Sequence, residues 1–275
     1  MLTLRRFFAT LGPGVLWLAV FLIVPVAIMF GYSLLTRTDL AQVGGPLTLE
    51  SWGRVFGYDA LFREWVPDNL RVLGRSVLIA GFSTLLCVLM GYPLAFYIAR
   101  QPARRKSFLL LLLIIPFWTN FLIRVYAWIL ILRPFDLVPS LTATFLGMVY
   151  AFLPFFVLPV YSSVEKVDWR LLEAAQDLGA PPAKAFMAAV FPQTLPGLIA
   201  GILLTFIPAL GTFVVSDILG GAKTALIGNL VQNQFGQAGD WPYGSALSFL
   251  LMGAVLVGLW LYARAAGQKG LEELI

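Results

Sequence analysis

Two ionisable residues lie inside long apolar stretches of this sequence, and they are the first candidates for chemistry. Arg124 lies within residues 108–132, and Asp217 lies near the end of residues 195–219. Charged groups inside a membrane are costly and usually serve a transport path or an ion pair. We consider three roles for them. They form an ion pair with each other, they face a path, or they extend to the outer membrane surface.

Aromatic and polar side chains stand close to these two charges in the sequence. A flexible organic polycation is attracted by a carboxylate and by the faces of aromatic rings. We hypothesise that such a path is lined by Asp217 together with Trp118, Asn120, Tyr126, Phe213 and Ser216. The alternative for the aromatic residues is packing against lipid or against neighbouring helices.

Residues for other chemistry are scarce. The chain has no His, which removes the commonest general base and metal ligand. Its single cysteine, Cys87, stands in an apolar run, so it forms no internal disulfide and is expected to be a small core residue. With no acidic cluster inside the apolar runs either, we find no catalytic or metal-binding constellation and expect no enzyme activity and no metal.

The segment Gly220-Gly221-Ala222-Lys223-Thr224 resembles a phosphate-binding loop only superficially. A P-loop needs Gly directly before the Lys, and Ala222 stands there instead. We interpret the segment as a Gly-rich turn after a helix. We therefore expect that this chain holds no ATP and no cofactor of its own.

Composition indicates that these residues are carried by membrane-spanning helices. Of the 275 residues, 60% are hydrophobic and only 12% are charged, and the mean hydropathy is +0.87. A soluble domain is typically about one quarter charged. The net charge of +5 is sorted by loop, so we take it to reflect membrane topology rather than binding of nucleic acid.

About 20 apolar residues in a helix cross a bilayer. The first run follows Arg5 and Arg6 like a signal peptide, but it is too long and lacks a cleavage site, so we expect it to be retained. We predict a single all-α polytopic membrane domain over residues 1–275 with about six transmembrane helices. The predicted spans are residues 12–35, 73–99, 108–132, 142–161, 195–219 and 244–263.

The basic cluster Arg100, Arg104, Arg105 and Lys106 sets the orientation, because short loops rich in Lys and Arg stay in the cytoplasm. Both termini are then cytoplasmic, and residues 36–71 form a long outer loop. In that loop Thr48 could cap a short helix that reaches Phe56. The aromatic residues of the loop either anchor it in the membrane interface, or the loop packs on the helices. At 1.5 Å per residue, uninterrupted helices would put Arg124 about 24 Å and Asp217 about 33 Å from the inner surface.

Glycine and proline suggest local departures from straight helices. Pro208 and Gly211 are expected to interrupt the fifth run, and a broken helix inside a membrane is tolerated where it is buried or lines a cavity. Gly197 and Gly201 form a G-x-x-x-G pair suited to close helix contact. The pair fits packing within the subunit and a dimer interface equally well.

The loop at residues 166–192 is the most informative segment. Leu171, Leu172, Ala175 and Leu178 fall on one helical face, and Gly179 is placed to end that helix. Pro181 or Pro182 can begin a second short helix. From physical considerations alone, this cytoplasmic helix-turn-helix is either a docking element or an ordinary amphipathic connector.

The pattern Glu173-Ala174-Ala175-x3-Gly179-x9-Ala189-x-Phe191-Pro192 resembles the EAA loop of ABC importer permeases. The family form has Ile and Leu where this chain has Ala189 and Phe191. The resemblance implies that Glu173, Ala174, Ala175 and Gly179 form the element that couples the permease to an ATPase.

The resemblance extends from about Arg75 to Arg264 and is to the permeases of spermidine/putrescine importers. It rests on stretches at residues 116–120, 123–126, 161–166, 215–223, 226–229 and 240–244. It implies a multi-pass protein of the bacterial inner (cytoplasmic) membrane that moves a polyamine. The implied partners are a second homologous permease, two ATPase subunits that bind ATP and Mg, and a periplasmic substrate-binding protein.

Two rival functions are considered. One is a permease of the same type for another solute, such as iron, thiamine or a phosphonate. The other is an ATP-independent channel or secondary transporter, for which the coupling loop would have no purpose. The sequence does not determine which polyamine would be preferred.

Overall fold

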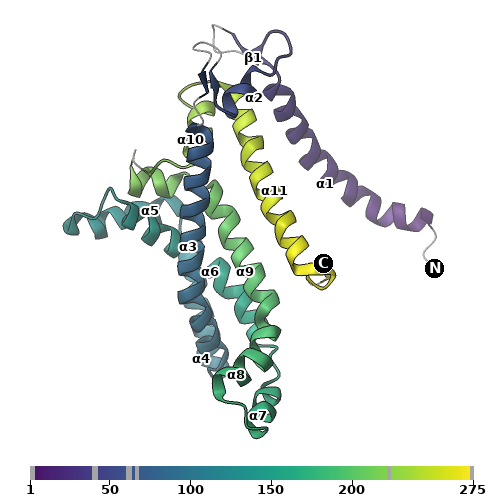
Figure 1. Cartoon of the computed structure of the whole chain (residues 1–275), viewed down its shortest axis with the longest axis vertical. Helices are drawn as coiled ribbons and strands as arrows, with labels where there is room; N and C mark the ends of the chain where they lie inside the picture. Colours follow the sequence, from purple (N-terminus) through teal and green to yellow (C-terminus); the bar gives the residue numbers. More distant parts are fainter. Residues whose placement is uncertain (1–3, 39–42, 60–63, 66–67, 222–223, 273–275) are drawn as a thin grey trace. The chain divides into compact units, whose positions relative to one another are not determined.

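The computed structural model describes residues 4–38, 43–59, 64–65, 68–221 and 224–272, and they are mainly helical (Figure 1). Within these residues, five helices are long and apolar enough to cross a membrane, and a bent helix pair raises the number to six. This confirms the predicted all-α membrane protein. The five helical stretches are α1 (Leu4–Ser33), α3 (Asp68–Ala99), α6 (Leu141–Val164), Pro182–Gly211 and α11 (Trp241–Glu272).

Shorter elements connect these helices. The outer loop contains α2 (Glu50–Val55), and two antiparallel strand pairs, β1 (Thr36–Arg37) with β2 (Val43–Gly44) and β3 (Tyr58–Asp59) with β4 (Glu64–Trp65). Between α3 and α6 lie α4 (Ala103–Ile114), η1 (Ile115–Trp118), α5 (Phe121–Leu132) and η2 (Arg133–Phe135). After α6 come α7 (Trp169–Asp177), α8 (Pro182–Ala185), the π-helical η3 (Phe186–Val190), α9 (Phe191–Gly211), η4 (Ser216–Gly220) and α10 (Ile227–Phe235).

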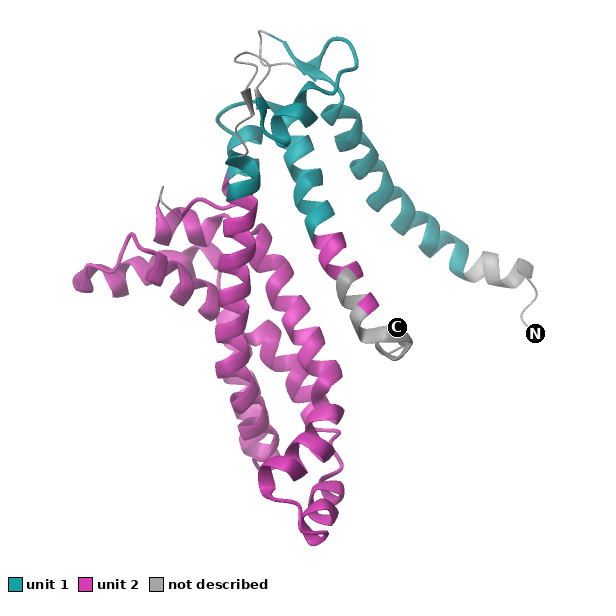
Figure 2. Ribbon diagram, viewed as in Figure 1, with its two compact units in different colours: residues 1–71, 230–254 teal, residues 72–229, 255–275 magenta. Residues whose placement is uncertain are grey.

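The chain divides into two compact units, which are described separately (Figure 2). Unit 1 comprises residues 1–71 and 230–254, and unit 2 comprises residues 72–229 and 255–275. Unit 1 holds the outer loop and its supporting helices. Unit 2 holds the residues that the sequence selected as functional.

A partly buried ion pair joins elements of unit 1. Arg54 on α2 contacts Asp240 at 2.8 Å, and the Asp240 side chain is 7% exposed. The same guanidinium lies 4.0 Å from the centre of the Tyr243 ring, and Asp240 also accepts a hydrogen bond from the Tyr243 backbone N–H. Asn69 donates to the backbone oxygen of Arg54. These contacts connect α2 to the beginning of α11.

The outer loop therefore packs on the helices of its unit, as one of the two alternatives from the sequence expected. Thr48 accepts a hydrogen bond from the Glu50 backbone N–H at 2.8 Å, but the N-cap position of α2 is Leu49, one residue later than predicted. Trp52 donates to Ser33 of α1, and Val55 is fully buried. The helix ends one residue before Phe56, which remains 44% exposed.

Close packing of α6 against α9 forms the centre of unit 2. The two helices run side by side in Figure 1. A Cβ atom at Gly201 would lie 2.9 Å from the Phe156 carbonyl oxygen, and one at Gly197 would lie 2.5 Å from the Pro159 carbonyl oxygen. In the structure, the G-x-x-x-G pair serves packing within the subunit.

Two predicted straight spans are interrupted. The third run turns by 97° between Trp118 and Phe121, because Pro116 lies in the short η1 and Asn120 begins a new helix. The fifth run continues through Pro208 and ends at Gly211, and η4 follows after extended backbone at Thr212. The depths expected for Arg124 and Asp217 assumed straight helices, so these bends invalidate them.

Candidate functional site

The helix-turn-helix predicted at residues 166–192 is present at one end of unit 2 (Figure 2). Asp168 caps α7 by accepting a hydrogen bond from the Arg170 backbone N–H. At the other end, Gly179 has a φ of +85°, a left-handed conformation that glycine adopts at low cost. The Ala180 N–H bonds to the Ala175 carbonyl, which completes a Schellman motif. The sequence prediction that Gly179 ends this helix is confirmed.

The coupling candidates lie on an open surface. Glu173, Ala174 and Gly179 are exposed, and Ala175 is half-buried. The apolar stripe predicted on α7 does not all face the protein, since Leu171 is 52% and Leu178 is 90% exposed. Such large apolar side chains, beside the small Ala174, form a surface that another protein could cover.

Aromatic residues join α7 to the end of α3. The Trp169 ring lies edge-on to Phe96, with ring centres 6.2 Å apart, and the Arg100 guanidinium lies 4.8 Å from the Trp169 ring centre. Phe96 also contacts Phe186 of η3, with ring centres 5.6 Å apart. Sequence reasoning missed this cluster, since only helical spacing from Phe96 to Arg100 could have suggested a shared face.

An ion pair fixes the preceding segment. Lys106 at the start of α4 lies 2.9 Å from the carboxylate of Glu165, directly after α6. The hydrogen bond from the Lys106 ammonium lowers the pKa of the Glu165 carboxyl below its ordinary value, and the Tyr161 hydroxyl contributes in the same direction. Glu165 is therefore ionised at neutral pH.

One residue proposed to line the path, Asn120, instead has a structural role at the bend between α4 and α5. Asn120 caps α5, because its side-chain oxygen accepts the Leu122 backbone N–H at 2.8 Å. Trp118, immediately before the bend, is 79% exposed, and Tyr126 on α5 is 56% exposed. Both rings are therefore accessible.

Arg124 lies among aromatic rings. Its guanidinium carbon is 4.9 Å from the centre of the Phe117 ring, 5.5 Å from that of Phe121 and 5.9 Å from that of Tyr150. Its Nε and Nη1 atoms are shielded from solvent and have no hydrogen-bond partner in the described part of the chain. The hypothetical Arg124–Asp217 ion pair is not formed in this structure, although α5 packs against η4, which carries Asp217.

The residues around Asp217 divide into accessible and internal groups. Asp217 is exposed, and Phe213 is 37% exposed. Ser216 is fully buried, and its hydroxyl lies 2.6 Å from Asn229 and 3.0 Å from the Phe213 carbonyl. Because these hydrogen bonds occupy the Ser216 hydroxyl, its proposed place in the path finds no support here.

Asn229 was not selected from the sequence as a site residue. Its amide oxygen accepts from the Leu226 N–H as well as from Ser216, and its amide nitrogen donates to Phe213. It thereby holds the backbone on both sides of η4. The only signal in the sequence was a single Asn in an apolar region. Its hydrogen bonds to Ser216 and Phe213 could not be predicted, because those residues lie 13 and 16 positions away.

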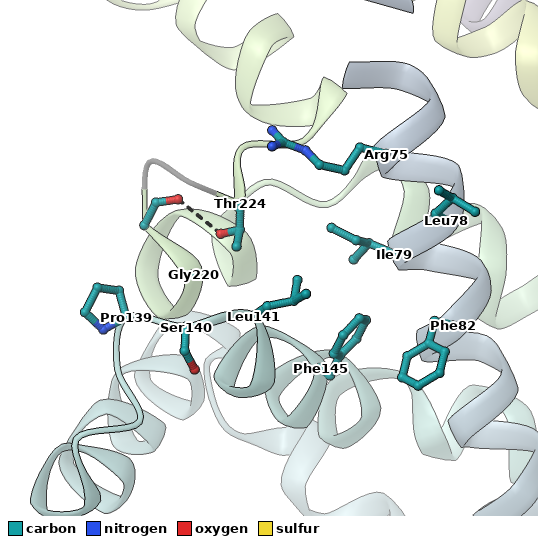
Figure 3. Close-up of a pocket in the computed structure, with 11 residues that line it drawn as sticks. Arg75, Leu78, Ile79, Phe82, Pro139, Ser140, Leu141, Phe145, Gly220 and Thr224 are labelled. Carbon is teal, nitrogen blue, oxygen red and sulfur yellow. Dashed lines mark hydrogen bonds between the residues drawn. The ribbon is translucent and has the colours of Figure 1, made fainter. Parts of the chain in front are cut away.

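A cavity of about 860 Å³ lies between α3, the start of α6 and the end of η4 (Figure 3). Its walls are mainly apolar side chains, including Leu78, Phe82 and Phe145, and Arg75 lies at its rim and donates to the Ala225 carbonyl. A cationic rim over apolar walls does not suit an ammonium group, so we do not assign this cavity to an organic cation.

The glycine-rich segment forms part of the same wall. Gly221 has a φ of +66°, and a Cβ at Gly220 would collide with the Thr144 and Thr224 hydroxyls. These positions form a tight turn after η4, as the sequence indicated, while Ala222 and Lys223 lie outside the described residues. Among the residues that the structure describes, no group of three His, Cys, Asp or Glu side chains is placed to hold a metal ion.

Comparison with solved structures identifies the fold. A chain of a bacterial ABC transporter that imports the acidic polysaccharide alginate superposes with a TM-score of 0.66 at 15% identity, covering 91% of each chain. A chain of the MetNI methionine ABC transporter in an inward-facing conformation gives a TM-score of 0.54 at 18% identity, covering 74% of this chain and 95% of the other.

Sequence relatives cover nearly the whole chain. The "Spermidine/putrescine transport system permease protein PotB" of Escherichia coli (strain K12) is 40% identical over 273 residues, covering 92% of this chain and 96% of the relative. The protein of the same name from Haemophilus influenzae is 36% identical and covers 90% of each chain. The "Inner membrane ABC transporter permease protein YdcU" of Escherichia coli is 31% identical and covers 71% of each chain.

The sequence model of one protein family matches residues 91–266. That range contains α4 to α10, with the helix-turn-helix of residues 166–192 among them, and most of α11. The chain belongs to the family described as "Binding-protein-dependent transport system inner membrane component".

Proposed function

We propose that this chain is a membrane-spanning permease subunit of an ATP-driven polyamine importer, with spermidine or putrescine as substrate. The observation that carries the proposal is the 40% identity, over 92% of the chain, to a protein named as a spermidine/putrescine permease. In this proposal the chain works in the bacterial inner membrane with both termini in the cytoplasm. It forms the path together with a second homologous permease.

The helix-turn-helix at residues 166–192, which we call the coupling hairpin, would transmit the conformational change that ATP hydrolysis drives in the ATPase. Two partner ATPase subunits would bind ATP and Mg and dock against the open face of α7, formed by Glu173, Ala174, Ala175 and Gly179. Support comes from the exposure of Glu173 and Ala174 and of the apolar side chains Leu171 and Leu178. Movement of α7 would reach α3 through Trp169 and Phe96, and α9 through η3. A periplasmic binding protein would deliver the substrate.

The direct test is uptake of radiolabelled spermidine and putrescine by proteoliposomes that contain the complete complex and its binding protein. We expect uptake that requires ATP and is reduced by unlabelled polyamines. Uptake that persists without ATP would contradict the coupling. Competition by ferric iron, thiamine or a phosphonate, but not by polyamines, would contradict the substrate class.

The variants Glu173→Lys and Gly179→Asp test the hairpin. Lys reverses a charge on the docking face, and Asp at Gly179 imposes a side chain on backbone with a φ of +85°. We expect uptake to fall by at least tenfold while the amount of protein in the membrane is unchanged.

A further inference from the structure

The three rings around Arg124 have the geometry of a binding site for one organic cation. Aromatic faces within about 6 Å attract ammonium and guanidinium groups, and cages of several rings recognise alkylated ammonium groups. Phe117, Phe121 and Tyr150 all lie within that distance of the Arg124 guanidinium carbon. We call these three residues the aromatic cage.

Neighbouring rings hold the cage in shape without Arg124. Phe117 packs edge-to-face against Phe155, with ring centres 5.1 Å apart. Tyr150 packs edge-to-face against Trp128, with ring centres 5.5 Å apart. The cage would therefore keep its geometry if the guanidinium moved out.

The guanidinium is held in the cage by the rings rather than by hydrogen bonds. Its Nε and Nη1 atoms have no hydrogen-bond partner among the described residues. A guanidinium bound by several directed hydrogen bonds would be expensive to displace, whereas one bound mainly by ring faces can exchange with another cation. Tyr150 is 36% exposed, so the cage is also accessible from outside the protein interior.

We propose that the aromatic cage is an alkylammonium-binding site and that Arg124 occupies it until a substrate ammonium replaces the guanidinium. The substrate class rests on the proposed function, and the cage itself rests on the contacts above. Two like charges cannot share the cage at low cost. The displaced guanidinium therefore needs an acidic partner, and Asp217 is exposed on η4, the element against which α5 packs.

Fluorine NMR of the complete complex tests the cage directly. Para-fluorophenylalanine replaces Phe117, and putrescine is titrated with Arg124 retained and with Arg124→Gln. We expect a saturable shift of the fluorine resonance in both complexes. Half-saturation should need about tenfold less putrescine in Arg124→Gln, which corresponds to a cage filled by Arg124 for about nine-tenths of the time.

Phe145 provides the matched control, because its ring packs on Phe82, with ring centres 4.8 Å apart, and lines the cavity that we do not assign to a cation. A fluorine label at Phe145 should not respond to putrescine. Arg124→Met serves as a second variant if Arg124→Gln impairs assembly of the complex.

Absence of a shift at Phe117 in both Arg124 variants would overturn the proposal, and so would equal half-saturation with and without the guanidinium. Tetramethylammonium separates the cage from the proposed function. If the complex takes up no polyamine but tetramethylammonium still shifts the Phe117 resonance, the cage stands and the assignment of a polyamine substrate fails.

Discussion

At the residue scale, the structure separates charges that stabilise the protein from charges that are available for a ligand. Asp240 and Glu165 are both paired with a cation, at 2.8 Å and 2.9 Å. Asp217 is exposed next to Ser216, whose hydroxyl is buried and hydrogen-bonded. A carboxylate one helical turn after the partly exposed Phe213 is suited to attract a passing cation.

Asp217→Asn is expected to raise the substrate concentration needed for half-maximal uptake by about tenfold, because the attraction of one carboxylate for an ammonium is lost. Uptake kinetics in proteoliposomes measure it. Asp136→Asn, an exposed acidic residue beyond α5, is the control and should change uptake little. Unchanged kinetics for Asp217→Asn would remove this residue from the path.

The ion pair of Glu165 should make the stability of the protein depend on pH. The Lys106 ammonium lowers the pKa of the Glu165 carboxyl in the folded protein, so the pair contributes fully to the free energy of unfolding above the ordinary Glu pKa of about 4.3. This stabilisation is lost as the pH falls through the lowered pKa. We expect the unfolding temperature of the wild type to decrease more steeply than that of Glu165→Gln between about pH 6 and about pH 3. Parallel curves would show that the pair does not stabilise the fold.

At the element scale, glycine determines how closely the two central helices of unit 2 approach. Gly197 and Gly201 bring α9 against the backbone of α6, and Gly91 of α3 faces Phe156 of α6. In a membrane, such close approach replaces the hydrophobic effect as the main attraction between helices. Because α9 follows α7, α8 and η3 in the chain, its contact with α6 would, in the proposed function, connect the hairpin to the membrane helices.

Gly197→Ala should destabilise the protein by about 1–3 kcal/mol, because the new methyl group would lie 2.5 Å from the Pro159 carbonyl oxygen. The thermal unfolding midpoint in detergent measures this effect. Gly81→Ala on α3 is the matched control, since its Cβ would meet no atom within 4 Å. If both variants unfold at the wild-type temperature, the close contact between α6 and α9 is not needed for stability.

At the scale of the whole molecule, the proposed function requires that two segments of the chain lie on opposite sides of the membrane. The outer loop of unit 1 must face the binding protein, and the hairpin of unit 2 must face the ATPase. Leu47 in the loop is 77% exposed and Leu178 at the hairpin is 90% exposed, so each is a suitable reporter position. The native Cys87 is fully buried, which makes single-cysteine labelling practical.

Leu178→Cys in a Cys87→Ala background should resist a membrane-impermeant maleimide in intact spheroplasts and react in inside-out vesicles. Leu47→Cys should show the opposite pattern. The degree of labelling at each position gives the result. Reaction of Leu178→Cys from outside would contradict the orientation and, with it, the proposed coupling to ATP hydrolysis.

Composition and periodicity alone determined that the chain is an all-helical membrane protein, because its apolar content exceeds what a soluble core can bury. Local signals also located the helix-turn-helix at residues 166–192, since Asp168, Gly179 and the prolines act on their own backbone. The bend before α5 was missed because Pro116 and Asn120 stand inside an apolar run long enough to span the bilayer without interruption.

Only the tertiary structure decided which distant residues meet. Arg54 and Asp240 form an ion pair 186 positions apart, and Arg124 occupies a cage completed by Tyr150 of another helix. An ion pair with Asp217 was one of the three roles that the sequence left open for Arg124. Opposite charge makes that pairing favourable. In the structure, however, α5 follows a 97° bend and its Arg124 guanidinium lies among aromatic rings instead.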